Sequence, residues 1–219
     1  YYKPSKDIKF KDVGLLIVDE EQKFGVSHKE AIKHFAHNVD VLTLTATPIP
    51  RTLEMSLTGI RDLSMITTPP ENRQPILTYV HEYDERAVAE AIRRELLREG
   101  QVFFVHNRVK DLEHFADKIR DLIPEARVVT AHGQMRDNQL ENVVNDFYDR
   151  KYDVLISTTI VESGLDLPAV NTLIVDRADT LGLAQLYQLR GRVGRRGQRA
   201  YAYLFSPKNQ ALSHLAYER

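Results

Sequence analysis

The 219-residue sequence contains neither cysteine nor tryptophan. Without cysteine, the chain can form no disulfide and no thiolate metal site, which excludes zinc-finger classes. It also lacks an excess of charge of either sign, because 30 Lys and Arg stand against 31 Asp and Glu, for a net charge of -1. A bulk polyanion-binding surface is therefore not expected, and any contact with DNA must come from local placement of basic side chains.

Long apolar runs are missing as well. None approaches the roughly 18 residues that a membrane-spanning helix requires, and the chain does not open on a charged-then-apolar signal segment. The 42% hydrophobic and 28% charged composition is typical of a globular chain with room for one or two domains. We therefore expect a cytoplasmic protein.

Short runs rich in Val, Ile and Leu alternate with segments of helical period, which is typical of an α/β fold with a parallel sheet flanked by helices. Helical stripes such as that of Val88, Ile92 and Leu96 lie between the candidate strands. Gly100 follows this helix, where a residue of positive φ is often needed. The predicted strands are 13–18, 40–45, 76–80, 101–106, 127–131, 153–157, 171–176 and 200–205.

A break in composition divides the chain. Three prolines, Pro69, Pro70 and Pro75, stand within seven residues, which excludes a helix and favours an extended connector. We expect one domain over residues 1–75, a second over 76–210, and the start of a following helical segment at 211–219.

In the first domain a buried strand ends in two carboxylates, Asp19 and Glu20. The carboxyl edge of a parallel sheet is where open α/β folds bind ligands. Asp19 can hold Mg²⁺ through water, and Glu20 can orient or deprotonate an attacking water. The alternative is a strand that ends in solvated acids at a turn.

The next predicted strand ends in two hydroxyl residues, Thr45 and Thr47, the second followed by a proline. Such a segment suits the coupling of one site to another. A threonine-rich strand end is also common without any function.

Hydroxyl groups follow a strand of the second domain at Thr158 and Thr159, with Gly164 and Asp166 shortly beyond. Hydroxyls and exposed amides suit phosphate contacts, and an acid there suits a ribose hydroxyl or an arginine partner. Asp166 before Leu167 and Pro168 can equally be part of a plain turn. His132 and Gly133 also lie between a predicted strand and a predicted helix. This segment can either contact a phosphate or form a capped turn without further function.

The run from Gln188 to Arg195 spaces arginines and glycines as a helix does when it places guanidinium groups against phosphates. Arginine offers a planar, permanently charged fork that neutralises charge on a transferred phosphoryl group. Gly191 and Gly194 let neighbouring backbone approach. The alternative is a solvated basic face.

Five of these segments follow one another along the chain: Asp19–Gln22, Thr45–Pro48, the strand Val102–His106, Thr158–Asp166 and Gln188–Arg195. In this order they resemble motifs II to VI of superfamily 2 helicases. The longer strings Asp19–Val26, Leu44–Thr52 and Gly182–Arg192 are similar to the branch that holds the RecG and transcription-repair coupling (Mfd) families. The second family is the closer match, because Asp62–Ser64, Thr68–Arg73, His106–Val109 and Ile123–Ala126 resemble it; RecG is the runner-up.

This resemblance implies an ATP-driven motor on double-stranded DNA, built from two lobes of the RecA-like P-loop NTPase fold with ATP and Mg²⁺ between them. In the transcription-repair coupling family the motor displaces a stalled RNA polymerase and recruits excision-repair proteins, through modules that these residues do not include. The implied roles are Mg²⁺ binding and water activation for Asp19 and Glu20, coupling to DNA for Thr45 and Thr47, nucleotide contacts for Gly164, Asp166, Gln188, Arg192 and Arg195, and DNA contacts for His132, Gly133, Thr158, Thr159 and Arg190.

One expected motif is missing: the sequence contains no G-x-x-x-x-G-K-[ST] loop, whose amides and lysine cradle the phosphates in such motors. We therefore expect a fragment, with a truncated first lobe and a complete second lobe, that is inactive alone. The open edge of a truncated sheet predicts self-association. A non-hydrolysing scaffold that binds DNA or protein is the alternative from a different class.

Overall fold

The computed structural model describes residues 12–19, 39–45, 62, 64–66, 68, 74–159, 169–194, 197–209 and 214. The chain divides into two compact units, Tyr1–Thr67 and Thr68–Arg219. The identity of these units as a first and a second motor lobe, with the boundaries given above, stays a prediction.

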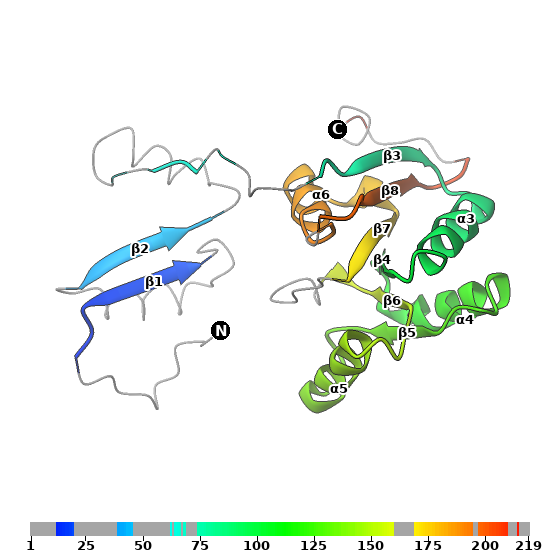
Figure 1. Cartoon of the computed structure of the whole chain (residues 1–219), viewed down its shortest axis with the longest axis horizontal. Helices are drawn as coiled ribbons and strands as arrows, with labels where there is room; N and C mark the ends of the chain where they lie inside the picture. Colours follow the sequence, from blue (N-terminus) through cyan, green and yellow to red (C-terminus); the bar gives the residue numbers. More distant parts are fainter. Residues whose placement is uncertain are drawn as a thin grey trace. The chain divides into compact units, whose positions relative to one another are not determined.

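The described part of the first unit is a pair of parallel strands, β1 (Leu15–Asp19) and β2 (Asp40–Leu44). Their register pairs Leu15 with Asp40 and Asp19 with Leu44, so both strands end at the same edge (Figure 1). A parallel pair needs a long crossover, and the chain between Asp19 and Asp40 supplies it.

The second unit contains a six-stranded sheet in the order β3-β8-β7-β4-β6-β5, and every pair of neighbours is parallel. Parallel strands put all their carboxyl ends at one edge, which is the edge that open α/β sheets use for ligands. The strands are β3 (Leu77–Glu82), β4 (Gln101–His106), β5 (Val128–Ala131), β6 (Val154–Ser157), β7 (Val170–Asp176) and β8 (Tyr201–Ser206).

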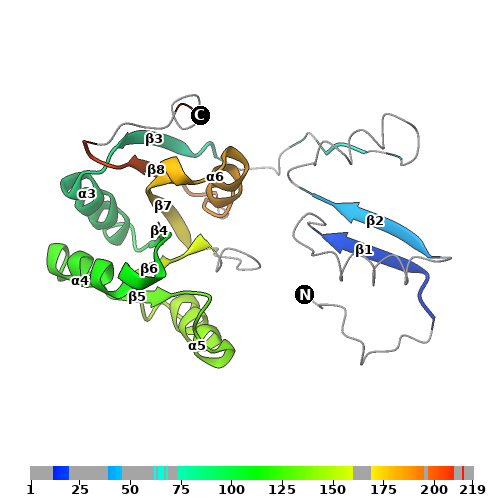
Figure 2. The ribbon, with the colours of Figure 1, turned by 180° about the vertical axis from the view of Figure 1, so that it is seen from behind.

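Helices connect these strands and cover both faces of the sheet (Figures 1 and 2). They are α3 (Glu85–Leu96), α4 (Leu112–Leu122), α5 (Asp137–Tyr148) and α6 (Leu183–Arg190), with 3-10 turns at Val109–Asp111 and Ala178–Thr180. The start of α3 is fixed by Asp84, whose carboxylate accepts a hydrogen bond from the Arg86 amide at 2.9 Å.

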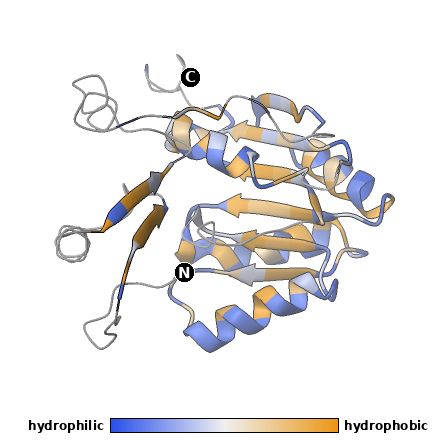
Figure 3. Ribbon diagram, turned by 60° about the vertical axis from the view of Figure 1, so that its left-hand side comes forward, coloured by the Kyte–Doolittle hydropathy of each residue, from blue (hydrophilic) through white to orange (hydrophobic). Residues whose placement is uncertain are grey.

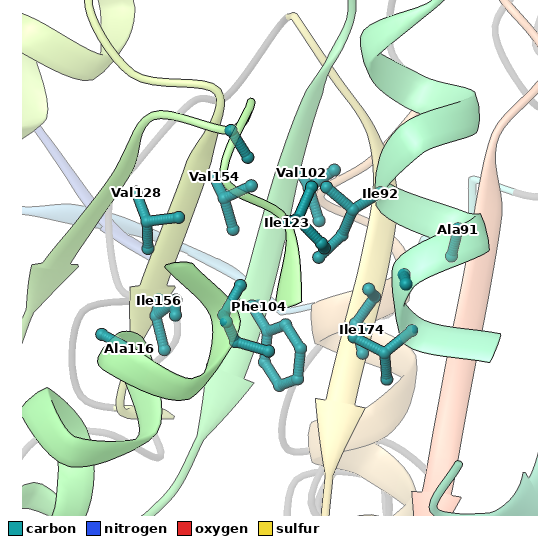
Figure 4. Close-up of a cluster of buried hydrophobic side chains, with 14 of the residues drawn as sticks. Ala91, Ile92, Val102, Phe104, Ala116, Ile123, Val128, Val154, Ile156 and Ile174 are labelled. Atoms are coloured by element: carbon teal, nitrogen blue, oxygen red, sulfur yellow. The ribbon is translucent and has the colours of Figure 1, made fainter. Parts of the chain in front are cut away.

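Two apolar clusters fill the space between the helices and the sheet. Residues of α3 and α4, such as Ile92 and Ala116, pack against Phe104 and Ile156 on one face of the sheet (Figure 4). Phe147 of α5 and Leu189 of α6 pack against Phe103 and Leu173 on the other face. The central strands are therefore apolar on both sides, whereas the outer faces of the helices are polar (Figure 3).

All eight predicted strands are confirmed, because a run of β-branched and apolar residues between turn signals marks a buried parallel strand well. The expectation for Gly100 is wrong: the residue with positive φ after α3 is Glu99, at 56°. Gly100 is needed for space, because a Cβ there would lie 1.8 Å from the Glu95 Oε1.

Candidate functional site

The structure brings Asp19 and Thr45 to one edge of the first unit. Asp19 ends β1 and pairs in register with Leu44, and Thr45 follows Leu44 directly. The predicted positions of an acid and of a coupling hydroxyl therefore lie side by side along the carboxyl edge of β1 and β2. Glu20 and Thr47 lie outside the described residues.

Asp19 fits a magnesium ion that keeps most of its waters. Its side chain is exposed at a strand end, and Mg²⁺ needs only one or two protein carboxylates in such sites. Within the described ranges, no cluster of three or more acidic or histidine side chains forms a fuller cage. The carboxylate of Asp19 suits a magnesium ion bound through water, and this role stays a prediction.

In the second unit, His132, Gly133, Thr158 and Thr159 all come to the carboxyl edge of the sheet. His132 and Gly133 follow β5, and the two threonines follow β6, its neighbour. The Thr159 hydroxyl donates to Asn107 Oδ1 at 3.1 Å, and Asn107 follows the next strand, β4. Three adjacent strands thus contribute polar groups to one edge.

Two of these residues have a buried polar atom without a hydrogen-bond partner among the described residues. Thr158 is 1% exposed, and its Oγ1 has no hydrogen-bond partner among the described residues. His132 is half-buried, and its Nδ1 atom is buried and also has no hydrogen-bond partner among the described residues. A buried polar atom without a partner costs free energy, so such atoms often mark a place where another group binds.

A pair that the sequence analysis did not single out lies at the same edge. His106 ends β4, Asp176 ends β7, and the two are register partners. The His106 Nδ1 and the Asp176 Oδ2 are 2.7 Å apart, with side chains 8% and 13% exposed. The sequence pattern that could have identified His106 and Asp176 is the one that identified Asp19, a polar residue at the end of an apolar strand.

The surroundings of this pair are apolar and negatively charged. The imidazole stacks on Phe115 at 4.2 Å between ring centroids. Burial raises the pKa of the nearby Tyr83 above its ordinary range, and the negative charges of Asp176 and Glu85 raise it further. Tyr83 therefore stays a neutral phenol beside the pair.

The residue after Asp176 adopts an unusual backbone conformation. Arg177 has φ 56° in the left-handed region, which is uncommon for a residue with a Cβ. The Thr180 hydroxyl donates to the Arg177 carbonyl at 2.8 Å, and the Arg177 guanidinium lies 3.4 Å from Asp179. These contacts hold the tight turn that leads from β7 into α6.

The helix α6 carries Gln188 and Arg190, with Arg192 just beyond its end. The expectation of a helix through residue 195 is wrong, because α6 ends at Arg190 and Gly191 caps it. The guanidinium of Arg190 lies 4.7 Å from the centre of the Tyr187 ring. Gln188 and Arg192 are half-buried.

Gly194 explains why the helix cannot continue. Its φ is 75°, and a Cβ there would lie 2.7 Å from the Ala200 Cβ. Its amide donates to the carbonyl of Val170, the first residue of β7, at 3.2 Å. The chain after α6 therefore returns at Gly194 to the amino end of β7.

Three further predicted residues, Gly164, Asp166 and Arg195, lie outside the described residues. In the part of the chain that the structure describes, no helix is long and apolar enough to cross a membrane.

Residues 86–197 match the family described as the helicase conserved C-terminal domain. The chain is also similar to curated proteins named transcription-repair-coupling factor: 60% identical over 215 residues in Bacillus subtilis, 59% over 212 in Mycobacterium tuberculosis and 55% over 213 in Escherichia coli. These matches cover 97–98% of the chain and only 17–19% of the relatives. The chain thus spans less than a fifth of their length, and its resemblance to transcription-repair coupling factors is confirmed.

Among solved structures, the chain resembles that of RecG bound to a three-way DNA junction, with a TM-score of 0.72 and 32% identity over 97% of this chain and 28% of that one. It also shares the fold of a variant of S. cerevisiae Dbp5 bound to RNA and ADP BeF3, with a TM-score of 0.71 at 15% identity over 96% of this chain and 56% of that one. The RecA-like α/β fold expected from the sequence is therefore confirmed.

Proposed function

The chain belongs to the family of helicase conserved C-terminal domains, and from this we propose that it is part of an ATP-dependent motor that moves on double-stranded DNA. The observation that carries the proposal is the family match over residues 86–197, which include the four strands β4 to β7 and the helix α6. We expect the motor to work in the bacterial cytoplasm, where chromosomal DNA lies.

The relatives favour a motor that acts on transcription. Proteins 55–60% identical to this chain are named transcription-repair-coupling factor, whereas RecG, the runner-up, is 32% identical. We propose that the longer protein displaces a stalled RNA polymerase and couples transcription to nucleotide excision repair. Its contacts with the polymerase and with repair proteins would lie in parts of the relatives that this chain does not span.

Each predicted residue has a role in this proposal. ATP supplies the energy and Mg²⁺ neutralises charge on its phosphates. Asp19 would hold the ion, Glu20 would orient the attacking water, and Thr45 and Thr47 would couple this edge to DNA. The nucleotide contacts would come from Gly164, Asp166, Gln188, Arg192 and Arg195, and the DNA contacts from His132, Gly133, Thr158, Thr159 and Arg190.

The carboxyl edge of the sheet in the second unit suits a contact with DNA. Hydroxyl and amide groups at this edge suit the sugar-phosphate backbone of a nucleic acid. A guanidinium such as that of Arg192 suits the phosphates of a nucleotide. We propose that the polar groups that follow β4, β5 and β6, the DNA edge, contact DNA, and that Arg192 contacts ATP.

The test is ATP turnover by the longer protein with and without double-stranded DNA. We expect Glu20→Gln and Arg195→Ala to abolish DNA-stimulated turnover. Glu20→Gln removes the carboxylate that would orient the attacking water, and loss of an arginine finger lowers the rate of phosphoryl transfer by a factor on the order of 10³ or more. Glu90→Gln, on the exposed face of α3, is the control and should turn over ATP normally. We expect the 219-residue chain alone to be inactive, because it has no phosphate-binding G-x-x-x-x-G-K-[ST] loop. Absence of ATP turnover in the unaltered longer protein would favour the scaffold alternative, and unchanged turnover in both site variants would show that Glu20 and Arg195 are not needed for hydrolysis.

A RecG-like enzyme that remodels replication forks is the second candidate, because the RecG structure matches 97% of this chain. Such an enzyme would hydrolyse ATP in the same way, but it would act on a replication fork instead of a stalled RNA polymerase. Displacement of a stalled RNA polymerase from a DNA template by the longer protein, without regression of a synthetic fork, would support the first candidate. The reverse result would support the second.

A further inference from the structure

The His106–Asp176 pair links two segments that the proposed function uses. His106 is followed directly by Asn107, which accepts the hydrogen bond from Thr159 at 3.1 Å. Asp176 is followed directly by Arg177, whose left-handed turn begins the approach to α6. The pair therefore joins the predicted DNA edge to the strand that leads into the predicted nucleotide helix.

The geometry of the pair fixes the imidazole in one orientation. Asp176 lies 2.7 Å from Nδ1, so a carboxylate there requires a proton on that nitrogen. Phe115 stacks on the ring with an angle of 10° between the planes, which prevents the ring from tilting. His106 is 7% exposed, and its Nε2 has no hydrogen-bond partner among the described residues.

This arrangement argues against a role in packing alone. A buried apolar side chain would fill the same space beside Phe115 without an unpaired Nε2, but it could not donate a hydrogen bond to Asp176. A buried polar pair specifies one arrangement of the groups it joins, since every other arrangement leaves charge or donors unpaired. The groups joined here are the carboxyl ends of β4 and β7.

We propose that His106 is a positioning residue for the DNA edge, an inference that rests on the proposed function. Its Nδ1–H bond to Asp176 sets the carboxyl end of β4, so that Asn107 meets the Thr159 hydroxyl and holds it in place for the nucleic acid. His106 does not touch the DNA itself, because its side chain is buried.

Two amide substitutions separate this role from packing. Asparagine places its amide nitrogen near the position of Nδ1, whereas glutamine places it near Nε2. Both replace the imidazole, lose the Phe115 stack and introduce a neutral amide. Only His106→Asn can still donate to Asp176.

The experiment measures ATP turnover by the longer protein against the concentration of double-stranded DNA. We expect His106→Gln to raise the DNA concentration for half-maximal stimulation about tenfold, which corresponds to one hydrogen bond to a charged group. His106→Asn should stay within about twofold of the unaltered protein, and turnover without DNA should change in neither variant. Asp153→Asn weakens the contact of a half-buried carboxylate with Arg127 at the amino edge and is the control, with unchanged half-saturation.

A double variant tests the path through Asn107. If His106 acts by placing Thr159, the combination of His106→Gln with Thr159→Val should raise the half-saturating DNA concentration little more than Thr159→Val alone. The inference would be overturned if the double variant multiplied the two single increases in half-saturating DNA concentration. It would also be overturned if His106→Asn and His106→Gln raised that concentration equally. Absence of DNA-stimulated turnover in the unaltered protein would instead overturn the proposed function, and this inference with it.

Discussion

The Glu95 carboxylate accepts a hydrogen bond from the Thr172 hydroxyl at 2.7 Å, and both residues are fully buried. Glu95 lies on the last turn of α3 and Thr172 lies in β7, so this bond joins a helix to a central strand. Asn171 Nδ2 donates to the other carboxylate oxygen at 3.2 Å, and the Arg98 guanidinium lies 3.9 Å away. A buried acid is tolerated here because donors surround it.

Removal of the Thr172 hydroxyl should destabilise the protein, because it leaves one oxygen of the buried Glu95 carboxylate without a donor. We expect Thr172→Val to lower the free energy of unfolding by about 1–3 kcal/mol, because the carboxylate loses a donor that water cannot replace. Thr172→Ser keeps the donor and should cost clearly less. Urea unfolding of the full chain measures both. A serine variant that is less stable than the valine variant would contradict this account.

The same carboxylate makes Gly100 hard to replace. A Cβ at residue 100 would lie 1.8 Å from Glu95 Oε1, so Gly100→Ala must push the buried acid away from its donors. We expect a loss of about 1–3 kcal/mol in the free energy of unfolding, as for other overpacked sites. Gly182→Ala is the matched control, because its nearest neighbour would be Gln185 Oε1 at 3.6 Å, and it should change stability by less than about 0.5 kcal/mol.

The sequence predicted the sheet well, because each strand is a short apolar run bounded by turn residues, and that signal is local. The end of α6 was not predictable in the same way. Its arginines suit a helix, but the chain must turn where Gly194 adopts φ 75° and donates to Val170. That contact joins residues 24 positions apart, and no local pattern contains it.

The site shows the same limit. The polar ends of β5 and β6 could be predicted from strand ends and from the order of the motifs. The pairing of His106 with Asp176 depends on β4 and β7 being neighbours, which is a property of the strand order. Similarly, the role of Gly100 is not visible in the local sequence, because glycine is needed there to make room for a buried carboxylate five residues earlier, whereas Glu99 adopts the positive φ.

The first unit presents an apolar patch on one face of its two strands. The patch consists of Leu15, Ile17, Leu42 and Leu44, each 44–57% exposed. Contiguous exposed apolar side chains favour association. We expect the full chain to self-associate in sedimentation experiments, and Ile17→Lys to shift it toward the monomer. Leu97→Lys, at an isolated apolar residue that is 87% exposed, should leave association unchanged. Monomeric sedimentation of the unaltered chain at high concentration would contradict this expectation.

Asp153 should make stability depend on pH. Burial raises the pKa of Asp153, but the hydrogen bonds from the Arg127 side chain and amide outweigh it and hold the pKa below the ordinary range of an aspartate. A lowered pKa in the folded protein means that the stabilisation is present above the unfolded pKa and is lost as the pH falls through the folded pKa. We expect Asp153→Asn to lower the free energy of unfolding by about 1 kcal/mol at pH 7. This loss should vanish at a pH below the folded pKa of Asp153, where the carboxyl group is protonated.

Arg127→Met tests whether the same pair carries this pH dependence. It removes the side-chain donors that lie 2.7 and 2.9 Å from the carboxylate and leaves the backbone donor in place. The loss of stability should again be largest at neutral pH and should shrink in acid, because a protonated Asp153 no longer attracts the guanidinium. Thermal unfolding between pH 7 and pH 3 measures it. The double variant should lose little more than Asp153→Asn alone, since both changes remove one interaction. Losses that add, or that persist unchanged at pH 3, would show that the two residues stabilise the fold independently of their charges.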